Sequence, residues 1–230
     1  MKIVTDALIA GARRAEGTVV IIDVFRAFTV EPFVLAGGAA SLTAVGEADA
    51  AWSLRKEDPS VILIGERHGR RIEGFDYGNS PAAAAANDFR GRRVVHTTSA
   101  GTQGLANAVN AQHLLAASLV NASATATWIR RQNPAVVTLV CMGWEGKRNT
   151  EEDQLCADYI RSLLEGCGMS DIRKQAEALR CSEGKKFFDP AQAEVFPEAD
   201  FWLCTDVDRF SFAVRAEKEA SGFRMEAVQV

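Results

Sequence analysis

The sequence predicts an α/β protein of three layers, α/β/α, with a largely parallel central sheet between helices and an antiparallel addition from the C-terminal segment. One observation favours this fold class, and a second favours a single domain. Short apolar runs rich in β-branched residues alternate with segments of helical periodicity through most of the chain. No linker rich in Gly, Pro or Ser and no internal repeat interrupts the alternation, so residues 1–230 are expected to form a single domain.

The alternation of strands and helices begins near residue 18 and ends near residue 166. The predicted strands are 18–23, 41–45, 61–65, 93–97, 113–118 and 136–141, and the predicted helices are 26–36, 47–56, 81–88, 101–110, 123–132 and 150–166. The remaining residues predict a helix at 171–179, a turn at 187–190 and strands at 201–205, 210–216 and 223–228. We expect these last strands to add an antiparallel edge to the sheet.

Composition limits the classes of partner. The chain is 47% hydrophobic and 24% charged, with a net charge of −4, so it has no overall attraction for nucleic acid or an anionic membrane. Its most apolar stretch, 135–142, is far shorter than the roughly 20 residues of a membrane-spanning helix, and residues 1–17 lack the apolar core of a signal peptide. Five cysteines without a Cys-x-x-Cys pair predict reduced thiols. We therefore expect a cytoplasmic protein without nucleic-acid or membrane partners, and the sequence leaves open whether it forms a homo-oligomer.

Polar residues follow the first and third predicted strands at the point where each strand ends. Asp23 and Arg26 follow the first strand. Glu66 and Arg67 follow the third. Because ligands of open parallel sheets bind beyond the carboxyl ends of the strands, we expect these side chains to converge on a binding site. In a net acidic protein, such local donors must hold an anionic substrate.

The segment 97–102 follows the fourth predicted strand and opens a helix. The hydroxyl groups of Thr97, Thr98 and Thr102, together with the backbone at Gly101, could face a phosphate group at the positive end of that helix. Helix capping by Thr98 or Ser99 explains the same residues without any ligand. Both interpretations remain open from the sequence.

Several acidic residues suggest a metal site. Asp23, Glu66 and Asp76, with Arg26 nearby, would form the oxygen-rich cluster that Mg²⁺ prefers, and Asp76 lies in a polar, glycine-punctuated loop at 69–81. Arg26 stands in the first turn of a predicted helix, where a cation is unfavourable unless an anion lies beside it. The alternatives are that Asp23 caps the helix and that the other charges form surface ion pairs.

Motifs of other enzyme classes are missing. No Gly-x-Gly-x-x-Gly segment follows a strand, and no Gly-Lys pair is followed by the Ser or Thr of a P-loop, so dinucleotide and nucleoside triphosphate binding are disfavoured. Cys141 is followed six residues later by Lys147 instead of the arginine that cysteine phosphatases need. The three histidines have no metal-ligand spacing.

The order of these motifs resembles the 2-phosphosulfolactate phosphatase family, the ComB-like proteins. The resemblance runs from about residue 18 to residue 158, and its most specific block is Gly-Phe-Asp-Tyr-Gly-Asn-Ser-Pro at 74–81. The other matching stretches are Val-Ile-Ile-Asp-Val-Phe-Arg-Ala at 20–27, Gly-Glu-Arg at 65–67, Thr-Thr at 97–98 with Gly-Thr at 101–102, Ala-Ser-Leu-Val-Asn-Ala at 117–122, and Glu-Asp at 152–153 with Cys-Ala at 156–157.

The resemblance implies Mg²⁺-dependent hydrolysis of 2-phospho-3-sulfolactate to sulfolactate and phosphate, on a route to coenzyme M. A non-catalytic binder of anionic phosphorylated metabolites is the alternative, although such a protein would gain nothing from clustered carboxylates. The residues expected at the site are Asp23, Arg26, Glu66 and Asp76 for catalysis, the three acids among them for the metal, and Arg67, Asn79, Ser80, Thr97, Thr98, Gly101, Thr102 and Asn121 for the substrate.

Five positions depart from the family pattern. Phe28 and Val30 replace hydroxyl residues, and Ala100 replaces an asparagine. Met142 and Trp144 replace smaller or more polar residues. These departures leave the predicted phosphate and metal residues in place, but they leave open which phosphorylated hydroxy acid is the substrate.

Overall fold

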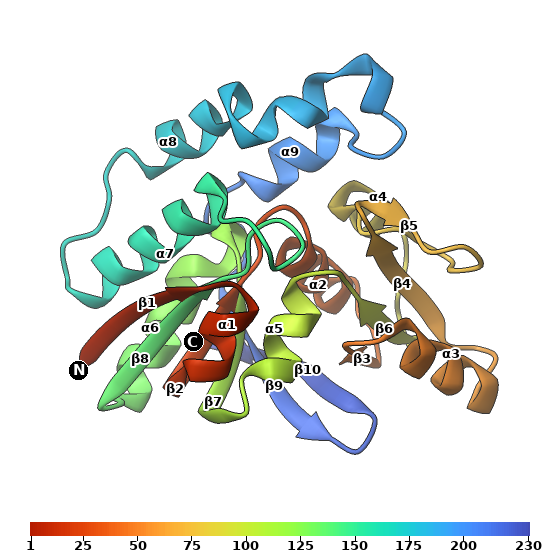
Figure 1. Cartoon of the computed structure of the whole chain (residues 1–230), viewed down its shortest axis with the longest axis horizontal. Helices are drawn as coiled ribbons and strands as arrows, with labels where there is room; N and C mark the ends of the chain where they lie inside the picture. The colour runs from red at the N-terminus through yellow and green to blue at the C-terminus, as the bar shows by residue number, and fades with distance from the viewer.

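The computed structural model describes residues 1–230 and shows an α/β protein built on one ten-stranded sheet (Figure 1). The strands are β1 (Lys2–Ala7), β2 (Glu16–Ile22), β3 (Ser41–Ala44), β4 (Ile62–Arg67), β5 (Arg70–Arg71), β6 (Arg93–Thr97), β7 (Asn110–Ala117), β8 (Val136–Cys141), β9 (Phe212–Glu219) and β10 (Gly222–Gln229). The helices are α1 (Leu8–Arg14), α2 (Ala27–Ala36), α3 (Ala48–Glu57), α4 (Pro81–Ala86), α5 (Gly101–Asn107), α6 (Ala122–Gln132), α7 (Glu151–Leu164), α8 (Ile172–Ala178) and α9 (Glu198–Cys204). Short 3₁₀ turns span Leu119–Asn121, Leu179–Cys181, Glu183–Phe188 and Pro190–Gln192.

Strand β2 shows why the fold has three layers. Its side chains point alternately to the two faces of the sheet. Val19 and Ile21 belong to one buried core, which contains residues of α1, α2 and α5. Val20 and Ile22 belong to a second core, which contains residues of α6, α7 and α9. Helices therefore cover both faces of a mixed, largely parallel sheet, which confirms the predicted fold class.

The sheet consists of two parallel blocks joined by an antiparallel hairpin. Its strand order is β1-β8-β2-β7-β9-β10-β3-β6-β4-β5. Pairing is parallel within β1-β8-β2-β7 and within β3-β6-β4, whereas β9 and β10 pair antiparallel with each other and with the strands on either side. The expectation of an antiparallel edge is wrong in this respect, because the C-terminal hairpin fills the middle of the sheet.

Two segments differ from the prediction. The segment 201–205 was expected as a strand but belongs to helix α9. The local signals for a helix are Pro197 directly before it and the acidic residues Glu198 and Asp200 in its first turn. Strand β1 and helix α1 were not expected at all, and β1 forms an edge of the sheet by pairing with β8. None of the helices combines the length and the apolar character that crossing a membrane requires.

Candidate active site

A pocket lies where the loops at the carboxyl ends of strands from both parallel blocks meet. These loops follow β2, β4, β6 and β8, and a residue preceding α9 completes the wall. The pocket therefore confirms that the carboxyl ends of the strands converge, as expected for an open α/β sheet. Its lining residues are Asp23, Phe25, Arg26, Glu66, Gly69, Asn79, Ser99, Ala100, Gly143, Trp144, Glu145 and Phe196.

Asp23 is buried at the end of β2 and held by two backbone N–H groups. Its Oδ1 accepts a hydrogen bond of 3.2 Å from the N–H of Ala27, and the N–H of Gly101 also donates to the carboxylate. A Cβ atom at Gly101 would lie 2.9 Å from Asp23 Oδ2, so only glycine lets α5 begin this close. Burial raises the pKa of Asp23 to about 7; the N–H of Ala27 opposes this shift, whereas the charge of Glu66 adds to it.

Glu66 is the second buried carboxylate of the pocket. Its Oε1 accepts the N–H of Ser99 at 2.7 Å, and its Oε2 accepts the N–H of Gly69 at 2.8 Å. Gly69 has a φ of +76°, and a Cβ atom there would lie 2.6 Å from the ring of Phe196. Glycine is therefore required for the turn that presents this N–H group to Glu66.

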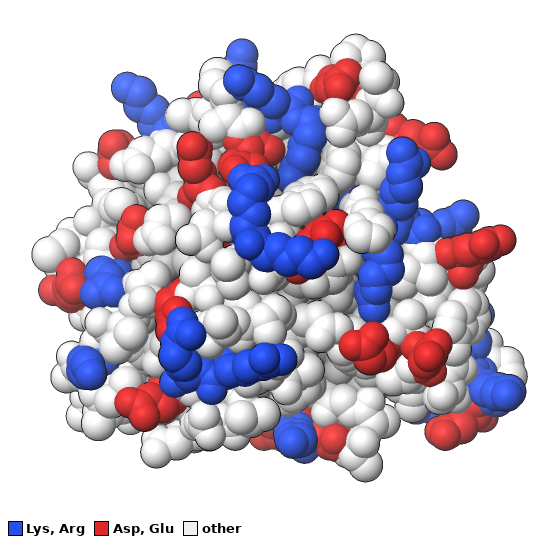
Figure 2. Space-filling view, in the orientation of Figure 1, with Lys and Arg blue, Asp and Glu red and all other residues white.

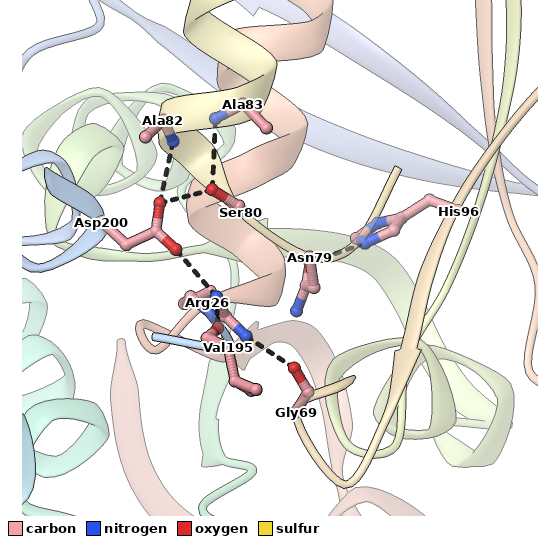
Figure 3. A network of polar contacts seen from close by, with 9 residues as sticks. All are labelled: Arg26, Gly69, Asn79, Ser80, Ala82, Ala83, His96, Val195 and Asp200. Carbon is pink, nitrogen blue, oxygen red and sulfur yellow. Dashed lines mark hydrogen bonds and ion pairs between the residues drawn. The ribbon is translucent and has the colours of Figure 1, made fainter. Parts of the chain in front are cut away.

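Arg26 lines the pocket, but its own chain already binds most of its guanidinium group (Figure 3). Nη1 donates to Val195 O at 2.8 Å and to Asp200 Oδ2 at 2.7 Å, and Nη2 donates to Gly69 O at 3.0 Å. These bonds occupy both hydrogens of Nη1 and one hydrogen of Nη2. Nε has no acceptor within the protein, so a single edge of the guanidinium group is left for a ligand.

Asp200 organises this side of the pocket, and the sequence analysis did not identify it. It lies on α9 and is fully buried. Besides Arg26, it accepts hydrogen bonds from Ser80 Oγ at 2.6 Å and from the N–H of Ala82 at 3.0 Å (Figure 3). One carboxylate thus joins the start of α2, the start of α4 and α9.

Asp76 does not join the other two acids. Its Oδ2 accepts the N–H of Leu63 at 2.7 Å and pairs with Arg55 of α3. Asp76 is partly exposed and lies outside the pocket lining. The prediction that Asp23, Glu66 and Asp76 gather around one metal is therefore wrong, because the loop folds back and uses Asp76 to satisfy a backbone group of β4.

Most of the other residues predicted to bind substrate are engaged within the chain. Thr98 Oγ1 accepts the N–H of Thr102 at 3.2 Å, and Thr102 Oγ1 accepts the N–H of Thr98 at 2.8 Å, so each hydroxyl satisfies a backbone group at or just before the start of α5. Arg67 donates to the carbonyl groups of Glu66 and Gly46 and faces a neighbouring hollow. Three further side chains are held in the same way: Ser80 accepts the N–H of Ala83, Thr97 donates to Gly46 O, and Asn121 accepts the N–H of Ser118. Only Asn79 of this group lines the pocket.

Two acids at the start of α7, Glu152 and Asp153, are buried. Asp153 accepts the N–H of Val24 at 2.8 Å and the N–H of Gly143 at 2.7 Å, and so ties together the loops after β2 and β8. Burial raises the pKa of Asp153, with a further contribution from Glu152. Burial also raises the pKa of Glu152 to about 7, and its Oε2 has no hydrogen-bond partner.

Lys186 is a cation that the sequence analysis also missed. Its Nζ lies 4.5 Å from the ring centroid of Trp144 and 5.4 Å from that of Phe196, and both rings line the pocket. Phe25 and Phe187 stand slightly farther away, each at 5.6 Å. Burial lowers the pKa of Lys186, whereas the charge of Glu152 opposes that shift. Cation–π contacts thus hold a positive charge behind the aromatic wall of the pocket.

The cysteines near the pocket are poor nucleophiles. All five cysteines are free, and Cys141 and Cys156 are buried. Burial raises the pKa of both thiols, and the charge of Asp153 adds to that effect. Because the thiolate is the reactive form, neither residue is suited to covalent catalysis.

Comparison with known proteins identifies the family of the chain. The family model described as 2-phosphosulpholactate phosphatase matches residues 3–215, and the chain belongs to this family. Three similar proteins bear the name probable 2-phosphosulfolactate phosphatase. The protein of Bacillus subtilis (strain 168) is 31% identical over 203 residues, 87% of each chain. That of Prochlorococcus marinus (strain MIT 9303) is 32% identical over 84% of this chain and 86% of its own, and that of Synechococcus sp. (strain RCC307) is 39% identical over 66% and 62%.

Proposed function

We propose that the pocket hydrolyses 2-phospho-3-sulfolactate, or a closely related phosphorylated 2-hydroxy acid, to the hydroxy acid and phosphate. The observation that carries the proposal is the placement of Asp23 and Glu66 in a member of this family: two buried carboxylates from the ends of separate strands line one pocket. A site built only to hold an anion would be weakened by two negative charges beside it. Catalysis with a metal ion explains why both are present.

Asp23 and Glu66 are the residues proposed to hold Mg²⁺. No group of three or more His, Cys, Asp or Glu side chains is arranged to hold a metal ion. Two carboxylates nevertheless suit Mg²⁺, which is commonly bound by one or two of them and completes its octahedron with water and substrate phosphate. The charge of Glu66 also raises the pKa of Asp23, so a cation between them would relieve their repulsion. When bound, Mg²⁺ would polarise the phosphoryl oxygens of the substrate.

The remaining pocket residues would bind and orient the anionic ester. On the face shown in Figure 2, basic and acidic side chains are interspersed, so the charge of the substrate must be met inside the pocket. Arg26 Nε and Asn79 Nδ2 have no acceptor within the protein and are available to substrate oxygens. Trp144 and Phe196 form an apolar wall that limits water, and the charge of Lys186 lies behind it.

Phosphate release from a substrate series tests this proposal. The series is 2-phospho-3-sulfolactate, 2-phospholactate, which lacks the sulfonate, and 2-phosphoglycerate, which carries a hydroxyl in its place. Each is assayed with Mg²⁺, with excess chelator, and with Mg²⁺ restored. We expect the sulfonate ester to have the highest kcat/KM, the chelator to abolish release, and Mg²⁺ both to restore it and to raise the melting temperature.

Two results would contradict parts of the proposal separately. Release that continues unchanged in excess chelator would exclude the metal site. If no phosphate is released from any of the three esters while they still raise the melting temperature, the chain is a binder of anionic metabolites and not a hydrolase.

A further inference from the structure

A buried histidine and glutamate lie directly behind Asn79, and the proposed function does not use them. His96 of β6 is 1% exposed and Glu31 of α2 is fully buried. Glu31 Oε1 lies 3.0 Å from His96 Nδ1, and Asn79 Oδ1 lies 3.0 Å from His96 Nε2. The three side chains form a line from the interior of α2 to the pocket.

The two strands beside β6 place no charged residue in register with the histidine. The strands beside β6 present Ala44 of β3 and Ile64 of β4 in register with His96, and both are buried aliphatic residues. The second oxygen of Glu31, Oε2, has no hydrogen-bond partner. Burial raises the pKa of Glu31, and the contact with His96 opposes that shift. An isolated buried carboxylate is unfavourable, so the pair is expected to keep a proton between its two members.

His96 Nε2 carries a hydrogen that faces Asn79 Oδ1, whichever member of the pair holds the shared proton. If the proton lies on Glu31, the ring is neutral, accepts at Nδ1 and carries its hydrogen on Nε2. If the proton lies on Nδ1, the ring is a cation with a hydrogen on each nitrogen. In both cases Nε2 donates to Asn79 Oδ1, and the amide nitrogen of Asn79 points the other way.

We infer that the Glu31–His96 pair fixes the side-chain amide of Asn79 with its N–H group facing the pocket, so that Glu31 and His96 are positioning residues for an anion donor. Figure 3 shows the Asn79 nitrogen directed away from His96, on the side of Arg26 and Gly69. If the pair lost its shared proton, Nδ1–H would still donate to Glu31, Nε2 would become an acceptor, and the amide would have to turn. Asn79 Oδ1 would then face the substrate and repel its oxygens. The consequence for substrate binding rests on the proposed function, whereas the proton on Nε2 does not.

Nitrogen NMR of histidine-labelled protein tests the proton directly and needs no substrate. The chain has three histidines, and exposed His68 and His113 can each be replaced by Gln to assign their signals, which leaves those of His96. We expect Nε2 of His96 to carry a proton at pH 7. An unprotonated Nε2 at that pH would overturn the inference, whatever the protein hydrolyses.

A double-mutant cycle tests the effect on the pocket, with kcat and KM for phosphate release and calorimetric binding of inorganic phosphate as readouts. Asn79→Ala should raise KM about tenfold or more, because a hydrogen bond to a charged group is lost. His96→Asn retains an amide near Glu31 but cannot reach Asn79, and it should raise KM similarly. The double variant should then be no worse than Asn79→Ala alone.

His96→Gln is the matched control, because its amide nitrogen can occupy the place of Nε2 and donate to Asn79 Oδ1. It should keep kcat/KM within about threefold of the wild-type value and remove the ionisation of the pair from the pH profile of KM. Effects of His96→Asn and Asn79→Ala that multiply would show a general structural role for His96 and overturn the inference. If the wild-type protein neither releases nor binds phosphate, the proposed function fails and the NMR experiment alone decides this inference.

Discussion

Charged side chains form networks in two regions of the molecule that differ in burial. Arg26 and Asp200 pair at 2.7 Å, are at most 4% exposed, and lie 174 residues apart in the sequence. On the hairpin β9–β10, Arg224 pairs with Glu217, Glu219 and Glu226 from the same two strands and is 43% exposed. The first pair joins segments that are far apart in the sequence and that meet beside the pocket. The second network lies on a hairpin whose two strands are already paired through their backbones. Breaking the buried arginine–carboxylate pair should therefore cost more stability than breaking an exposed one.

The largest effect is expected from breaking the buried pair. Asp200→Ala leaves Arg26 as an uncompensated buried charge and removes the acceptor of Ser80 and of the N–H of Ala82. We expect the free energy of unfolding to fall by about 3–5 kcal/mol, measured by urea denaturation. A loss below about 1 kcal/mol would show that the buried and exposed networks do not differ as proposed.

The buried acids should make the metal-free protein less stable as the pH rises. The pKa of Asp23 is about 7 in the folded protein and roughly 3.9 when unfolded, so the unfolded state releases this proton first. The stability due to protonated Asp23 is therefore present below about pH 4 and lost as the pH rises to about 7, at up to roughly 1.4 kcal/mol per pH unit. Urea denaturation between pH 5 and 7 in chelator should show a smaller slope for Asp23→Asn. An unchanged slope would contradict the assignment.

A moderate effect on substrate binding is expected from Lys186. Lys186→Met removes the charge behind Trp144 and Phe196 while keeping an apolar chain against the rings. We expect KM to rise about tenfold, corresponding to about 1.4 kcal/mol, with a smaller change in kcat. Lys185→Met is the control, because Lys185 is exposed beside it in the sequence. Equal effects of the two substitutions would exclude a specific role for Lys186.

The smallest effect is expected on the hairpin. Arg224→Ala should lower the free energy of unfolding by less than about 1 kcal/mol, and the loss should shrink further in high salt because water and ions screen exposed pairs. Urea denaturation at two salt concentrations measures both. A loss above about 2 kcal/mol would place the hairpin network in the same class as the Arg26–Asp200 pair.

The sequence identified those parts of the site that depend on where strands end. Asp23, Arg26 and Glu66 follow or end strands, and the carboxyl-end rule placed them correctly at one pocket. Their catalytic and metal-binding roles remain predictions. The hydroxyls of Thr98 and Thr102 could not be assigned in this way, because a phosphate loop and a helix cap use the same residues.

Other features have no local signal in the sequence. Asp200 and Lys186, from the C-terminal third of the chain, contact the pocket residues Arg26 and Trp144, which are far away in sequence. The position of the β9–β10 hairpin depends on pairing with β7 and β3, which periodicity does not reveal. Asp76 was misplaced for a similar reason, since the path of its loop back to Leu63 is a tertiary contact.

Glu66→Gln compared with Asp76→Asn tests the central claim most directly. Both substitutions replace a carboxylate by an amide, but Glu66 lines the pocket and Asp76 lies outside it. In phosphate release from 2-phospho-3-sulfolactate with Mg²⁺, we expect Glu66→Gln to lower kcat at least about a hundredfold and Asp76→Asn to change it less than about fivefold. Unfolding measured in parallel would show whether each variant is folded. A folded Glu66→Gln variant with near wild-type activity, or a folded Asp76→Asn variant without activity, would contradict the account.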